Sequence, residues 1–159
     1  MKLARETHRE IERFFREFYR DDTVVLPEVE IFVRRGAKVC SRLFGIHGIT
    51  FGRRIFIRPE LLKRDGQSRL IMPKDLLVHE LTHTMQYERE GFFGFLYGYV
   101  KAYLGNLKSK KTWGIESRTE AYLEIPHEIE ARDAAEKFAA FDVLRTSYSS
   151  SSSSVSSSK

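Results

Sequence analysis

The 159-residue sequence contains a single cysteine, Cys40. One thiol cannot form an internal disulfide, and a zinc ribbon needs several cysteines, so both of these classes of small domain are excluded. Any metal ion held by this chain must therefore be bound by histidine and carboxylate side chains. Cys40 itself is expected to be a small, buried, apolar residue.

Long apolar runs are also missing. The first residues, MKLARETHREIERFF, lack the apolar core of a signal peptide, and the longest apolar run is too short and too interrupted to cross a bilayer. We therefore expect a cytoplasmic protein without a transmembrane segment. The net charge of +5 is a mild excess, because 27 Lys and Arg residues are mixed with 22 Asp and Glu residues. No groove-reading motif is present, so nucleic acid is not an expected partner.

The length and the apolar content predict one hydrophobic core and one domain, over residues 1–145. From about Thr146 the chain is SYSSSSSSVSSSK, which cannot bury enough apolar area to offset the entropy lost on ordering. Residues 146–159 are therefore expected to be a disordered tail.

The stretch LLVHELTHTMQY, residues 76–87, places His79, Glu80 and His83 in the order HExxH. Side chains four residues apart lie one above the other on an α-helix, so both histidines can reach one metal ion. Two imidazoles suit Zn²⁺, and a neighbouring carboxylate can hold a water molecule and take its proton. The alternative is that both histidines are hydrogen-bonded core residues with no metal.

This stretch is predicted to be a helix that is buried on two sides and starts near Pro73. At about 100° per residue, its apolar side chains gather on one face and its polar ones on the opposite face. The first set is Leu77, Val78, Leu81 and Met85, and the second is His79, Thr82, His83 and Gln86. A helix with this pattern can form the floor of a cleft.

Elements on either side are indicated by apolar periodicity and by turn residues. The pattern predicts an amphipathic helix over 3–19, a strand over 29–33, a helix over 37–44, and two strands over 48–52 and 53–57 joined at Gly52. The segment 91–104, GFFGFLYGYVKAYL, is rich in aromatic residues. It could pack in the core, line a substrate groove or form an interfacial patch, and we rank these interpretations in that order.

A third metal ligand is expected from PHEIEARDAAEKF, residues 126–138, which predicts a helix from Pro126 to about Leu144. His127 and Glu128 border a face of small residues that would allow a close approach to the HExxH helix. Glu130 points further round the helix, so we expect it either to face solvent or to contact a metal ligand without binding the metal itself. On this pattern Glu128, Glu130 and His127 remain alternatives.

The succession VEIFVRRGAKVCSRLFGIHGITFGRRIFIRP, followed by LLVHELTHTMQY, resembles the short HExxH domain found in many bacterial proteins, including proteins associated with contractile injection systems. The likeness covers about residues 28–88. It implies an α+β, zincin-like minimal metallopeptidase fold, with a small mixed sheet packed on the HExxH helix and with N-terminal and C-terminal helices.

Residues 128–131 also resemble the second motif of gluzincins, in which a metal-binding Glu is followed three residues later by a small residue. This likeness implies that Glu128 is the third ligand and Ala131 the small residue. Arg132 departs from the motif, because many gluzincins have Asp or a similar polar residue there. The resemblance also implies that an extended substrate pairs with a sheet edge above the metal helix, and we assign that edge to Arg53–Ile57.

The expected function is that of a zinc metallopeptidase acting on a peptide or protein substrate. Zinc held by His79, His83 and Glu128 would lower the pKa of its bound water towards about 7, and Glu80 would accept the proton as general base. The oxyanion donor is left open among Tyr87, Tyr97, Tyr99, Tyr103, Tyr122 and His127. The alternative function is a non-catalytic, metal-binding or structural interaction module in a larger assembly.

Overall fold

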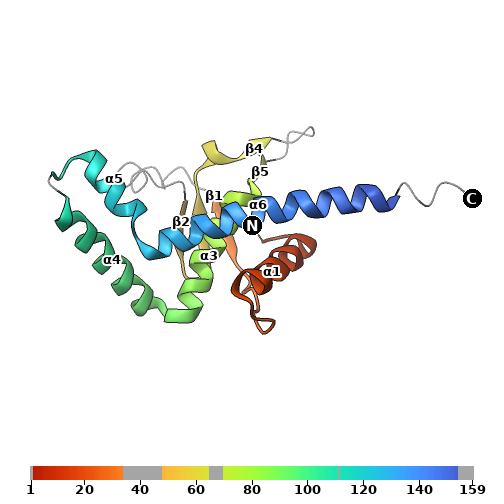
Figure 1. Ribbon diagram of the computed structural model, residues 1–159, viewed down its shortest axis with the longest axis horizontal. Helices are drawn as coiled ribbons and strands as arrows, with labels where there is room; N and C mark the ends of the chain where they lie inside the picture. Colours follow the sequence, from red (N-terminus) through yellow and green to blue (C-terminus); the bar gives the residue numbers. More distant parts are fainter. Residues whose placement is uncertain (1, 34–47, 65–69, 111, 154–159) are drawn as a thin grey trace, which may run out of the picture.

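The computed structural model describes residues 2–33, 48–64, 70–110 and 112–153 (Figure 1). This part of the chain is α+β, as predicted, with five α-helices, a three-stranded sheet and a two-stranded sheet. The helices are α1 (Arg5–Tyr19), α3 (Lys74–Glu90), α4 (Phe92–Ser109), α5 (Ile115–Leu123) and α6 (Pro126–Ser153). The strands are β1 (Glu30–Val33), β2 (Gly48–Phe51), β3 (Arg54–Ile57), β4 (Lys63–Arg64) and β5 (Leu70–Ile71), and η2 (Pro59–Leu61) is a 3-10 turn.

The three-stranded sheet is mixed, in the order β1-β3-β2. β3 pairs in parallel with β1 and antiparallel with β2, and Gly52, with φ of +57°, forms the turn between β2 and β3 as predicted. Ile31, Ile55 and Ile57 are buried on the side that faces the core. The predicted edge strand is wrong: β3 is central, because it pairs on both sides, and β2 is the edge strand next to α3.

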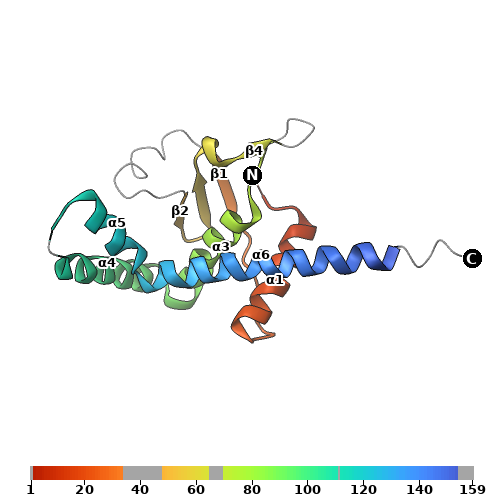
Figure 2. The ribbon, with the colours of Figure 1, turned by 45° about the horizontal axis from the view of Figure 1, so that its top comes forward.

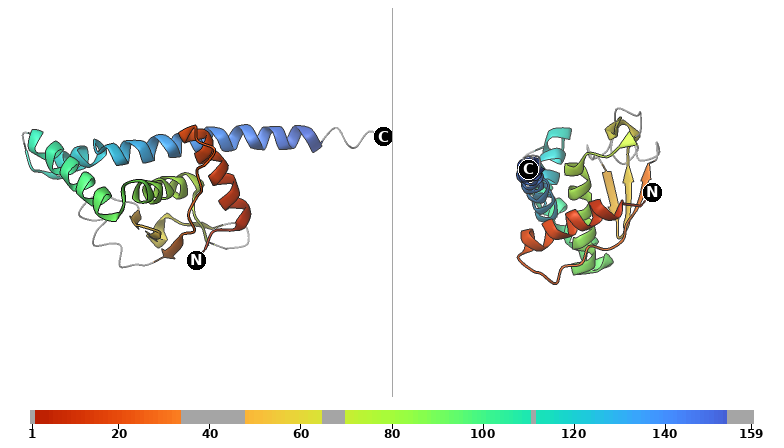
Figure 3. Two further views of the ribbon diagram at one scale, coloured as in Figure 1. Left: turned by 90° about the horizontal axis from the view of Figure 1, so that it is seen from below. Right: turned by 90° about the vertical axis from the view of Figure 1, so that its right-hand side faces the viewer.

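α3 lies between the sheet and α6, so that the HExxH helix forms the middle layer of the domain (Figures 2 and 3). Its apolar face, with Leu77, Val78 and Leu81, is buried in the core. Its other side packs closely on α6, where Ala131 and Ala134 are fully buried. The prediction of a helix buried on two sides is confirmed, and the small residues of α6 allow the close approach.

α1 packs against α6 on the same side as α3 and the sheet, and it closes the core there (Figure 3). Phe14 and Phe15 are buried, and the ring of Phe14 meets that of Phe138 edge-on with centroids 5.1 Å apart. The amphipathic pattern of residues 3–19 predicted this buried aromatic face. The helix ends at Arg20, whose left-handed backbone conformation, with φ of 54°, lets its N–H group bond back to Arg16 and Glu17.

Two expectations need correction. α6 continues to Ser153, beyond the predicted end near Leu144 and into the serine-rich segment expected to be disordered. Extending an existing helix adds one backbone hydrogen bond for each residue fixed, which composition alone did not take into account. α4 is mostly exposed, with Phe95 and Leu107 as its buried residues, so core packing does not describe 91–104 as a whole.

Some of the sequence predictions concern residues that the structure does not describe. The predicted helix over 37–44, Cys40 and the last six residues lie outside the described residues. Among the described helices, none is both long enough and apolar enough to pass through a membrane.

Candidate metal centre

The three side chains predicted to bind metal lie together. His79 and His83 come from successive turns of α3, and Glu128 comes from the first turn of α6. The imidazole Nε2 atoms of His79 and His83 lie 3.4 and 3.3 Å from Oε2 and Oε1 of Glu128, respectively. All three residues offer a ligand atom within 4.8 Å of the others, so they form a group that could hold a metal ion.

The geometry fits a tetrahedral ion with nitrogen and oxygen ligands. With zinc bonds of about 2.0–2.1 Å, neighbouring ligand atoms of a tetrahedron lie about 3.3–3.4 Å apart. The distances of 3.4 and 3.3 Å are close to this length, with each imidazole facing a different oxygen of Glu128, so the three side chains enclose a space of the size that such an ion needs. Oε2 of Glu128 is also buried without a hydrogen-bond partner in the described part of the chain. A buried, unpaired carboxylate oxygen facing imidazole nitrogens is well placed to bind a cation.

The charges of His83 and Glu128 stabilise each other. Burial alone would lower the pKa of His83, but the hydrogen bond and charge of Glu128 outweigh it and raise this pKa to about 9. Burial would raise the pKa of Glu128, but the neighbouring imidazoles of His79 and His83 hold it well below its ordinary value. Glu128 is therefore ionised, and a metal ion would replace the proton that it shares with His83.

Gln86 fixes how the His83 ring is turned. Its Nε2 donates to the carbonyl oxygen of His127 and to Oε2 of Glu130, both at 3.0 Å. Both partners only accept, so the amide must point its Oε1 towards Nδ1 of His83, 2.9 Å away. Nδ1 then carries a proton, and Nε2 is the nitrogen left to bind a metal.

Glu130 and His127, the two alternative third ligands, hydrogen-bond to residues outside the metal group. Glu130 accepts from Gln86, from the guanidinium of Arg89 and from the hydroxyl of Tyr19. His127 bonds through Nε2 to Glu90 at 2.9 Å. Glu130 contacts none of the three predicted ligands directly; it reaches His83 only through Gln86.

Glu80 lies beside the metal group and is 2% exposed. The hydroxyl of Thr50, on the edge strand β2, donates to Oε2 of Glu80 at 2.7 Å. The backbone of Gly48, on the same strand, passes so close that an added Cβ would lie 2.4 Å from Oε1. The strand thus lies directly against the carboxylate, and any side chain at position 48 would force the carboxylate to move.

A cavity of about 240 Å³ opens over these residues. Its walls come from β2, α3, α4, α5 and α6, and they are mainly apolar. The apolar and aromatic lining residues are Ile49, Phe51, Tyr87, Phe95, Leu96, Tyr99 and Tyr122. The metal group and Glu80 therefore face a water-accessible, largely apolar space, and part of α4 lines this space as one of the sequence interpretations expected.

Tyr99 and Tyr122 both lie beside Glu128 in the cavity, whereas Tyr97 does not. The Tyr99 hydroxyl donates to Oε1 of Glu128 at 2.7 Å, and Tyr122 lines the same cavity. Burial and the negative charge of Glu128 raise the pKa of both phenols, so both keep their protons at neutral pH. Tyr97 is 69% exposed and lies outside the lining of the cavity.

Sequence reasoning missed Gly48 and Thr50, and it placed Gln86 on the polar face of α3 without a role. Gln86 follows His83 by three residues, so the helix geometry puts both on one face, and this spacing was a usable signal. Nothing local distinguishes Thr50 from other strand residues. Its contact depends on how β2 lies over α3.

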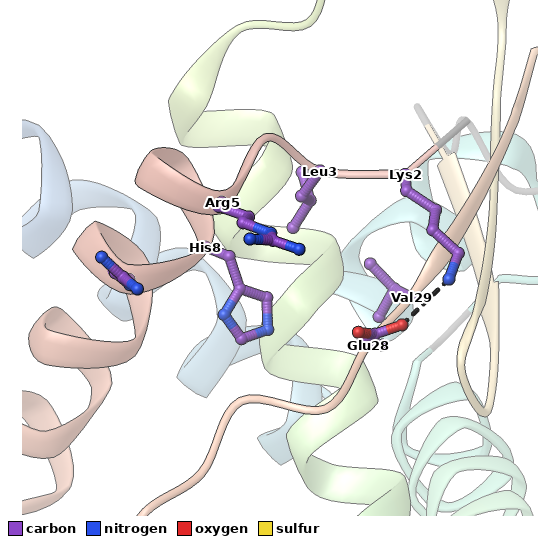
Figure 4. Close-up of a pocket in the computed structure, with 7 residues that line it drawn as sticks. Lys2, Leu3, Arg5, His8, Glu28 and Val29 are labelled. Atoms are coloured by element: carbon purple, nitrogen blue, oxygen red, sulfur yellow. Dashed lines mark hydrogen bonds and ion pairs between the residues drawn. The ribbon is translucent and has the colours of Figure 1, made fainter.

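A second cavity, of about 180 Å³, lies at the start of α1 (Figure 4). Basic residues dominate its lining, and the ammonium group of Lys2 pairs with Glu28 at 3.0 Å beside it. None of its lining residues belongs to the metal group. It is therefore separate from the candidate metal centre.

Comparison of the chain with protein-family models, with curated proteins and with solved structures gives no match. The assignment of the site therefore depends on the geometry of this chain. The likeness to short HExxH domains stays a prediction.

Proposed function

We propose that the protein is a small, zincin-like, zinc-dependent metallopeptidase. One observation carries the proposal: His79, His83 and Glu128 converge at distances that suit zinc, with Glu80 beside them in an apolar cavity. These three residues would hold the ion. When bound, Zn²⁺ supplies Lewis acidity, which activates water near neutral pH and polarises a carbonyl group.

Glu80 is the proposed general base. The Thr50 hydroxyl occupies Oε2 of its carboxylate, which leaves Oε1 to accept a proton from the attacking water. The same carboxyl group can then give this proton to the nitrogen of the leaving amine. A carboxylate fixed by a strand hydroxyl needs little rearrangement to carry out both transfers.

Tyr122 is the proposed donor to the developing oxyanion. It lines the cavity and keeps its phenolic proton, because burial and nearby carboxylates raise its pKa. The Tyr99 hydroxyl is already used by Glu128, so Tyr99 is expected to hold that ligand in place.

The substrate is proposed to be an extended peptide with an apolar side chain next to the cleaved bond. β2 pairs with β3 on one side, and it borders the cavity with Gly48, Thr50 and Phe51. The outer edge of a strand can pair with a peptide, and apolar walls favour an apolar side chain.

The test compares Glu80→Gln with a matched control, Glu88→Gln, on the same helix. Glu88 pairs with Arg53 and does not line the cavity. With quenched fluorescent peptides as substrates, Glu80→Gln is expected to lower turnover by at least about a hundredfold, while both variants keep the zinc content of the wild type. Zinc-loaded wild type that cleaves no peptide of a broad library would contradict the proposal and favour the non-catalytic module.

A further inference from the structure

α4 carries an apolar stripe on its outer side. Phe93, Tyr97, Val100 and Leu104 follow each other at steps of four, three and four residues, so they lie along one helix face. They are 83%, 69%, 51% and 48% exposed, respectively. The opposite side of the same helix buries Phe95 and lines the metal cavity. α4 is thus apolar on two sides, and among the described residues only the inner side is buried by the rest of the domain.

α4 itself contains lysines and no carboxylates, and Glu90 and Glu116 lie on either side of the segment in the sequence. From Gly91 to Ile115 the sequence has four lysines and no Asp or Glu. Lys101 and Lys108 follow Tyr97 and Leu104 by four residues, so each lies one turn along from a member of the stripe. Both lysines are exposed and form no ion pair with a described residue, and Lys101 lies over the Tyr97 ring at 5.6 Å.

We propose that the outer stripe of α4 docks the domain on an anionic lipid bilayer. A helix with exposed aromatic and aliphatic side chains and flanking lysines buries its apolar face at the headgroup boundary, and its lysines attract anionic headgroups. Trp113 and Ile115, directly after α4, are 63% and 83% exposed and extend the apolar surface. Indole rings favour the interface between lipid and water.

The charge pattern favours lipid over a second copy of the chain. In a symmetric pair, the stripe of one copy would meet the stripe of the other and bring Lys101 and Lys108 of both copies close together. Like charges at such a contact oppose association, whereas an anionic surface neutralises them. α4 also lies on the outside of the domain, away from the C-terminal part of α6 (Figure 1).

Docking would place the metal cavity close to the membrane surface. The inner side of α4 forms one wall of that cavity, and a helix with its side chains is about 10–12 Å across. The inference does not depend on hydrolytic activity, since it rests on the exposed side of the helix.

The test is sedimentation of the full chain with vesicles of phosphatidylcholine alone or with about one-third phosphatidylglycerol. The wild type is expected to bind the anionic vesicles, at least about tenfold more tightly than the neutral ones, and to dissociate as salt is raised. Phe93→Ser combined with Tyr97→Ser should weaken binding at least about tenfold, and Lys101→Gln combined with Lys108→Gln about tenfold. Val25→Ser, at a position 68% exposed outside α4, is the control and should bind as the wild type does.

All substituted side chains are exposed, and circular dichroism with thermal melting checks that each variant folds. Failure of the wild type to sediment with anionic vesicles would overturn the inference, as would equal binding by the Phe93 and Tyr97 double variant. Analytical ultracentrifugation without lipid tests whether a second copy of the chain covers the stripe instead. A wild-type dimer that becomes monomeric in the double variant would assign the stripe to a second copy and would overturn lipid docking.

Discussion

At the scale of single residues, the candidate metal centre depends on how its ligands are oriented. Oε1 of Gln86 accepts a hydrogen bond from Nδ1–H of His83, and Nε2 of Gln86 donates to Glu130 and to the backbone of His127. Glu130 is ionised, because its hydrogen bonds with Arg89, Gln86 and Tyr19 lower its pKa against the opposing effect of burial. These hydrogen bonds keep Nε2 of His83 aimed at Glu128.

Replacing Gln86 by Leu should therefore weaken metal binding without removing a ligand. Leucine has a similar size but accepts no hydrogen bond, so the His83 ring loses its fixed orientation and tautomer. We expect zinc affinity to fall about 10–100-fold, measured by competition with a chromogenic chelator. Thr119→Val, at an exposed position on α5, serves as a control and should leave the affinity unchanged. Unchanged affinity in the Gln86 variant would show that the amide does not orient the ligand.

Gly48 is the second residue with a specific expected effect. In Gly48→Ala the new Cβ would lie 2.4 Å from Oε1 of Glu80, so the carboxylate must move away from its hydrogen bond with Thr50. Turnover should fall at least about tenfold while zinc content stays the same, because no ligand is touched. Gly105→Ala is the matched control, since its Cβ would meet nothing within 4 Å. Full activity in Gly48→Ala would show that Glu80 needs no fixed position.

Residue spacing predicted some of these roles and could not predict others. His79, Glu80 and His83 follow from helical geometry alone, because all three lie within five residues. The choice of Glu128 as third ligand depended on the resemblance to the second gluzincin motif, because spacing did not distinguish it from Glu130 or His127. Thr50 reaches Glu80 only through the packing of a strand on a helix, and no local pattern encodes that contact.

At the scale of elements, the domain is held together by α3, α6 and α1. Apolar periodicity predicted α1 and α3 and the start of α6, and the glycine turn predicted the hairpin of β2 and β3. The strand order was not predictable, because β1 pairs in parallel with β3 across a long intervening segment. The edge strand was misassigned for this reason. Periodicity also identifies an apolar helix face without saying whether protein covers it, as the outer stripe of α4 illustrates.

Phe138 joins two helices, and its replacement is expected to lower stability. Its side chain is 1% exposed on α6, and it meets Phe14 of α1 edge-on. Phe138→Ala should lower the free energy of unfolding by about 3–5 kcal/mol, measured by urea denaturation. Val143→Ala, also on α6 but 69% exposed, should change it by less than about 1 kcal/mol. Equal effects of the two substitutions would contradict the proposed packing of α1 on α6.

At the scale of the whole molecule, the metal group joins parts of the chain that are distant in sequence. His79 and His83 belong to the central helix, and Glu128 belongs to the helix packed over it. An ion bound by all three stabilises the folded chain, because the unfolded chain does not bring these residues together. Zinc at about a hundred times its dissociation constant should add about 2.7 kcal/mol to the free energy of unfolding and raise Tm by about 5–10 °C. A chelator should reverse the shift, and a Tm that does not respond to zinc would contradict binding to the folded state.

The most direct test of the metal centre is the zinc content of three purified proteins after dialysis, measured by elemental analysis. The wild type and His127→Ala should each hold one zinc ion per chain, because His127 bonds to Glu90 rather than to the metal group. Glu128→Ala should hold almost none, since only two imidazoles remain. Wild-type protein without zinc, or Glu128→Ala protein with as much zinc as the wild type, would contradict the assignment of the site.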